Sequence, residues 1–62
     1  MITLQLAPDE ATFLAGQLAA RIDHLQYELV HTDDRALHRS LAEDLGRLEA
    51  LRQRLSREAK AA

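Results

Sequence analysis

A long helix is predicted by residues 8–31, PDEATFLAGQLAARIDHLQYELVH. Proline suits the first position of a helix, and the two acids that follow it suit the first turn, where the helix dipole favours negative charge. Apolar side chains then recur at the spacing of one helical face, and no breaker interrupts them before His31. This stripe consists of Ala11, Leu14, Ala15, Leu18, Ile22, Leu25 and Leu29. We therefore expect an amphipathic helix that turns its stripe toward a core.

A second helix is expected over residues 33–58, after a polar break. Thr32 or Asp33 can cap its start. Its leucines keep the alternating spacings of three and four that are typical of coiled coils, with Asp44 at one of the apolar positions. They are Leu37, Leu41, Leu48, Leu51 and Leu55, with Leu45 beside them. We expect residues 59–62 to fray.

Residues 1–6 alternate apolar and polar side chains, which predicts a short strand. No second strand is predicted elsewhere in the chain. The expected partner is therefore the same segment of another copy. A start without regular structure is the alternative.

The expected fold is all-α, with one domain over residues 1–62 that forms an antiparallel two-helix hairpin after the short strand. The antiparallel register places Arg21 beside Asp44, where we expect it to pair with that acid at the edge of the apolar seam. Two helices leave a core open on two sides, and for so short a chain hydrophobic burial and lost conformational entropy both amount to roughly 90 kcal/mol. Because no cysteine is present for disulfides, we expect a homodimer that closes a four-helix bundle. Its predicted interface is Leu14, Leu18, Ile22, Leu25, Leu29, Leu37, Leu41, Leu48 and Leu51.

A second group of apolar or small side chains lies on the opposite side of the first helix. It consists of Phe13, Gly16, Ala20 and Tyr27, and it includes both aromatic residues of the chain. A glycine costs about 1 kcal/mol inside a helix, which favours a packing role for Gly16. We predict a surface for a protein partner here, and an incidental exposed surface is the alternative.

No catalytic, cofactor or metal site is predicted. Glu28 and His31 have the Glu-x-x-His spacing of di-iron bundles, with His24 one turn earlier, but all three lie outside the leucine stripe. We expect them to form solvated polar surface. A chain this small, without cysteine, a glycine-rich phosphate loop or paired buried carboxylates, is not expected to be an enzyme.

The net charge of the chain is −2, but it is distributed unevenly along the sequence. Residues 1–34 carry a net charge of −5 and residues 35–62 a net charge of +3. The difference suits two helices that attract one another, or a basic half that contacts nucleic acid. Arg47, Arg54 and Arg57 are interleaved with acids and have no aromatic neighbour for base stacking, which favours a solvated face. No apolar run reaches the roughly 20 residues of a membrane span and no secretory signal is seen, so we expect a cytoplasmic protein without membrane contact.

Two resemblances can be stated on these residues. The opening residues 2–10, ITLQLAPDE, resemble the start of ribbon-helix-helix DNA-binding proteins. That resemblance implies strands paired between two chains, with Thr3 and Gln5 reading bases in the major groove. The remainder, with YEL at 27–29, TD at 32–33 and a leucine-rich second helix, resembles small uncharacterised bacterial proteins that are predicted to be helical hairpins.

The expected function is that of a small non-catalytic module for protein–protein interaction and oligomerisation. Its leucine-rich helix faces would carry the assembly. The alternative is a dimeric DNA-binding regulator or antitoxin-like protein that uses the N-terminal strand.

Overall fold

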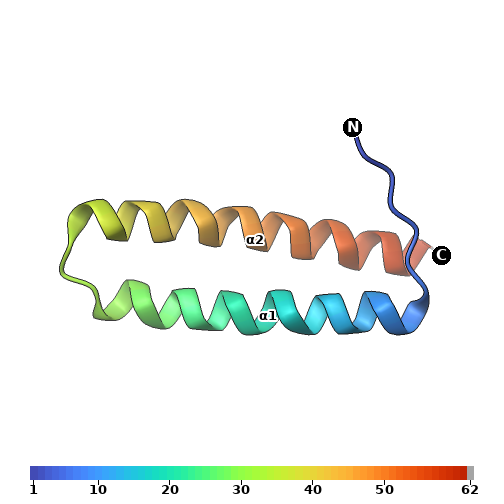
Figure 1. Ribbon diagram of the computed structural model, residues 1–62, viewed down its shortest axis with the longest axis horizontal. Helices are drawn as coiled ribbons and strands as arrows, with labels where there is room; N and C mark the ends of the chain where they lie inside the picture. Colours follow the sequence, from blue (N-terminus) through green and yellow to red (C-terminus); the bar gives the residue numbers. More distant parts are fainter. Residues whose placement is uncertain (62) are drawn as a thin grey trace.

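The chain forms an all-α hairpin, shown in Figure 1 by a computed structural model that describes residues 1–61, with side chains for residues 1–58. Its two helices, α1 (Pro8–His31) and α2 (Arg35–Ala61), run antiparallel and pack against each other. The hairpin measures 42 × 23 × 14 Å and is therefore a single layer of helices. The predicted two-helix hairpin is confirmed.

Local hydrogen bonds explain why α1 covers the residues predicted for it. Pro8 takes the first helical position, where its missing N–H costs nothing. The Glu10 carboxylate accepts a hydrogen bond from the Ala7 amide at 2.8 Å, and the Thr12 hydroxyl donates to the Pro8 carbonyl oxygen at 3.0 Å. At the other end, Nδ1 of His31 donates to the carbonyl oxygen of Tyr27 at 2.8 Å. Both ends of α1 are thus fixed by side chains close in sequence.

The start of α2 differs from the prediction by two residues. Asp34, and neither Thr32 nor Asp33, caps the helix: its Oδ1 accepts a hydrogen bond from the Leu37 amide at 3.1 Å. The Asp34 carbonyl oxygen accepts the first helical bond, from the His38 amide at 2.8 Å. The Thr32 hydroxyl instead accepts a hydrogen bond from the Asp34 amide inside the turn, at 3.4 Å. Asp34 stands three residues before Leu37, which is the spacing at which an N-cap side chain reaches a free amide of the first helical turn. The helix α2 therefore begins at Arg35.

The far end of α2 also differs from the prediction. The prediction ends the helix at Glu58, whereas α2 continues through Ala61, and the fraying of residues 59–62 stays a prediction. The sequence Glu-Ala-Lys-Ala over 58–61 has high intrinsic helix propensity, which accounts for the extension. The expectation for Ala62 lies outside the described residues.

The core is narrow because only one stripe of each helix faces the other. Within the described side chains, only Ile22 and Leu25 are buried, at 3% and 1% exposed. Half-buried apolar side chains extend this contact along both helices: Ala11, Ala15, Leu18, Ala19, Leu29, Leu41, Leu45, Leu48 and Leu55. The hydrophobic contact is therefore centred on the middle of α1.

Residues 1–7 have no helical or strand structure in the single chain. No strand occurs anywhere in residues 1–61, so this segment has no partner within its own chain. Ile2 and Leu4, from the predicted strand, are 92% and 71% exposed. Figure 1 shows the segment leading away from the start of α1, at the end of the hairpin opposite the turn. Strand pairing would need a second chain.

The cap provides a direct test of the turn. Replacing Asp34 by Ala removes the acceptor of the Leu37 amide and is expected to lower the free energy of unfolding by about 1 kcal/mol. For a chain of this size that corresponds to a melting temperature about 4–8 °C lower, measurable by circular dichroism. Asp34→Asn should keep most of the stability. Asp33→Ala is the matched control, and an equal loss from it would contradict the assignment of the cap.

Candidate interaction surface

Three leucines of the predicted interface remain exposed in the hairpin. Leu14 on α1 is 38% exposed, and Leu37 and Leu51 on α2 are 47% and 50% exposed. We call these three residues the open leucine face. The other predicted interface residues face between the two helices and are buried or half-buried: Leu18, Ile22, Leu25, Leu29, Leu41 and Leu48.

Helix geometry explains why the leucines of α2 divide into two rows. Residues seven apart lie nearly above one another. Leu41, Leu48 and Leu55 form one such row and are half-buried against α1. Leu37 and Leu51 belong to the neighbouring row, which a single partner helix does not cover. A coiled-coil pattern therefore offers more apolar surface than one hairpin can bury.

Leu14 lies on the same open side of the hairpin as Leu37 and Leu51. Around the axis of α1, Leu14 lies about 60° before the centre of the side that faces α2. Around the axis of α2, Leu51 lies at a similar angle before the centre of the side that faces α1. Because the two helices run in opposite directions, these displacements point to the same side. Leu14 and Leu51 are also level along the hairpin, because α1 ends at His31 and α2 begins at Arg35.

Arg21 and Asp44 lie in the middle of this open side. They follow Leu14 and Leu37 by seven residues each, and both are exposed. The register makes them level, as predicted, but they form no ion pair within 4.0 Å in the single chain. Each therefore keeps a free charge beside the open leucine face.

The second predicted surface also lies away from α2. Phe13 and Tyr27 are 69% and 61% exposed, and Gly16 and Ala20 between them are exposed. A Cβ added to Gly16 would meet no atom within 4 Å, so nothing within the hairpin requires glycine there. We call these four residues the outer aromatic face. Any packing role of Gly16 would have to involve another molecule.

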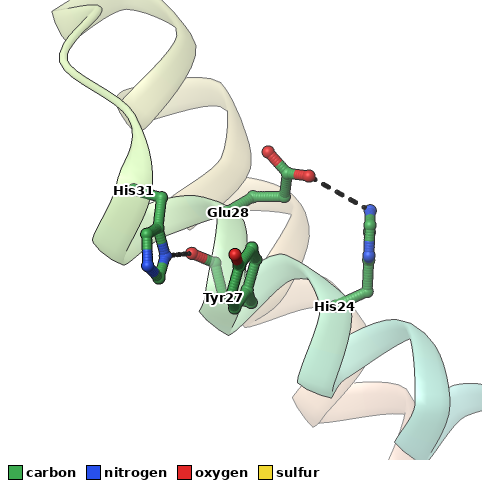
Figure 2. A network of polar contacts seen from close by, with 4 residues as sticks. All are labelled: His24, Tyr27, Glu28 and His31. Atoms are coloured by element: carbon green, nitrogen blue, oxygen red, sulfur yellow. Dashed lines mark hydrogen bonds and ion pairs between the residues drawn. The ribbon is translucent and has the colours of Figure 1, made fainter.

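A polar cluster borders the outer aromatic face near the end of α1 (Figure 2). His24 Nε2 lies 3.4 Å from Glu28 Oε1, and the His31 ring stacks on Tyr27 with centroids 4.0 Å apart. Glu28 thus turns toward His24 and away from His31. Within the described side chains, no three His, Asp or Glu residues come together in a group that could hold a metal ion.

The basic residues of α2 lie on exposed surface among acids. Shallow depressions here are lined by Glu49, Arg52, Gln53 and Ser56, and by Arg54, Arg57 and Glu58. Arg47 is also exposed. The structure thus brings together acidic and basic side chains, and no aromatic side chain joins them.

Val30 is a further exposed apolar side chain, at 80%, which the sequence patterns assign to no surface. Its sequence signal is weak, because it follows Leu29 of the buried stripe but points to a different side of α1. Neither helix in the described part of the chain is both long and apolar enough to cross a membrane.

No protein-family model, no curated protein and no solved structure significantly matches this chain.

Proposed function

We propose that the chain is a small non-catalytic oligomerisation module, which forms a homodimer by closing two hairpins into a four-helix bundle. The observation that carries the proposal is the exposure of Leu14, Leu37 and Leu51 on one side of the hairpin. A second layer of helices would cover them and complete a core that one layer leaves open.

The accessible area of the single chain supports this proposal. The hairpin exposes 5422 Å², whereas a compact monomer of 7.0 kDa is expected to expose about 4,000 Å². The excess, about 1,400 Å², includes the extended residues 1–7, and it compares with the roughly 800 Å² that each partner buries in a standard interface. A second copy of the hairpin could therefore be accommodated on the available surface.

Molar mass by light scattering tests the proposal, over a hundredfold range of loading on a sizing column. We expect the mass of two chains, falling toward one chain only at the lowest loading. A variant that lacks residues 1–6 should keep the dimer, because α1 and α2 are intact. A folded monomer at every loading would refute the homodimer, and a dimer that is lost with residues 1–6 would assign it to the strand.

We further propose that the outer aromatic face binds a protein partner. Exposed aromatic side chains are common anchors of interfaces, and Phe13 and Tyr27 are both free of α2. Replacing both by Ala should leave helicity and dimer mass unchanged but abolish partner capture in a pull-down. Wild-type capture by the double variant would contradict this role.

A DNA-binding regulator is the second candidate, favoured by the extended, exposed segment that contains Thr3 and Gln5. A phosphate-binding dimer should shift a labelled duplex at low salt and release it steeply as salt rises. The first basic side chain of the sequence is Arg21, so residues 1–20 bring no positive charge to a phosphate backbone. Absence of a shift at about 50 mM salt would exclude this candidate.

A further inference from the structure

We infer that α1 of one copy packs antiparallel on α2 of the second copy, through the open leucine face and around a two-fold axis parallel to the helices. This inference rests on the homodimer proposed above and specifies its geometry. Two hairpins stacked on the same face can also meet around an axis perpendicular to the helices. In that case α1 would lie on α1 and α2 on α2.

The distribution of leucines favours the parallel axis. Leu14 and Leu51 are level in one hairpin, and a parallel axis keeps both at the same level in the second copy. Four leucines then meet in one layer of the bundle. A perpendicular axis at the level of Arg21 and Asp44 would instead place Leu14 opposite Glu28 and Leu51 opposite Leu37 of the second copy. Glu28 follows Leu14 by two heptads and so lies in the same row of α1, which brings a carboxylate into each of those layers.

The charges of the two helices favour the same arrangement. Residues 8–31 carry four acidic side chains and one arginine, net −3, whereas residues 35–61 carry seven basic and four acidic side chains, net +3. The parallel axis puts a helix of each sign beside one of the opposite sign throughout the bundle. The perpendicular axis puts helices of the same net charge beside each other, and their repulsion costs free energy.

Arg21 and Asp44 mark the centre of the pairing. They are level, exposed and unpaired in the single hairpin. Around the parallel axis, Arg21 of each copy meets Asp44 of the other. Around the perpendicular axis, Arg21 would meet Arg21 and Asp44 would meet Asp44. The charged layer thus specifies one arrangement and opposes the other.

Distances between spin labels distinguish the two arrangements. The chain contains no cysteine, so single cysteines can be placed at Ala36, Glu43 and Ala50, which are exposed on the outer side of α2 and seven residues apart. Around the parallel axis, both labels of a dimer lie at the same level, so we expect nearly equal distances from all three sites by pulsed electron paramagnetic resonance. Around the perpendicular axis, the labels at Ala36 and Ala50 would be offset along the bundle by about 20 Å, at 1.5 Å per residue.

Light scattering on the same labelled chains separates the possible failures. A dimer whose label distances differ along α2 overturns this pairing and leaves the homodimer standing. A chain that stays monomeric at every loading overturns the homodimer and the pairing together.

Removal of the central charges provides an independent readout with opposite signs. Arg21→Gln and Asp44→Asn should each raise the dimer dissociation constant, by about fivefold, because each removes two cross-chain pairs. In a dimer with the perpendicular axis, both variants would relieve repulsion between like charges and would lower the dissociation constant. Arg39→Gln, on the exposed outer side of α2, is the matched control and should leave it unchanged.

Discussion

Replacing Leu25 by Asp is expected to abolish the helical fold. Leu25 is 1% exposed, the most buried of the side chains that the structure describes, and an unpaired carboxylate there would lie in an apolar contact. The expected loss is at least about 4 kcal/mol. A domain of this length has roughly 3–9 kcal/mol of stability in total, so little of the folded state should remain. Far-ultraviolet circular dichroism at 25 °C measures the loss of helix directly.

Gln26→Asp is the matched control for this substitution. Gln26 is the next residue on the same helix and is exposed, so the same charge changes helix propensity without entering the core. Helicity and thermal midpoint should remain close to those of the wild type. If Leu25→Asp kept its helicity and mass, the packing of α1 on α2 through Leu25 would be refuted.

Charging the open leucine face should dissociate the proposed dimer. In the double variant Leu14→Glu and Leu51→Glu, four carboxylates would replace the leucines that meet in one layer of the proposed bundle. Because those charges would be desolvated and mutually repulsive, the dissociation constant should rise by at least about a hundredfold. Analytical ultracentrifugation over a range of chain concentrations measures this change.

The control carries the same number of added charges on the other side of α1. Phe13→Glu with Tyr27→Glu alters the outer aromatic face, which the proposed bundle leaves uncovered. Its dissociation constant should match that of the wild type. Equal dissociation by both double variants would mean that the dimer is sensitive to net charge alone and that the open leucine face does not form its interface.

The sequence predicts the hairpin well because its determinants are local. Pro8 and the acids after it define the start of α1, and the leucine spacing identifies which side of each helix is apolar. The start of α2 is harder to predict, because Thr32, Asp33 and Asp34 all have side chains that can cap a helix. Only the folded turn determines which oxygen reaches the Leu37 amide.

The extent of burial could not be predicted from apolar periodicity. Leu48 and Leu51 belong to the same pattern, yet Leu48 is half-buried and Leu51 is 50% exposed. The difference depends on how far a second helix reaches around the first, which is a property of tertiary packing. The structure of residues 1–6 likewise depends on contacts that the pattern does not determine. Their alternation favours a strand, but one chain supplies no partner strand for it.

The three-residue turn between His31 and Arg35 has a kinetic consequence. It connects helices that are neighbours in sequence, and helical folds with such local contacts fold in microseconds to milliseconds. Two protein chains meet with rate constants of roughly 10⁵–10⁷ M⁻¹s⁻¹, so at micromolar concentration their encounter takes about a tenth of a second to ten seconds. If the proposed homodimer forms, each newly made hairpin would therefore exist alone for far longer than it takes to fold. During that interval its exposed leucines are open to any competing apolar surface, and the abundance of the chain determines how long the interval lasts.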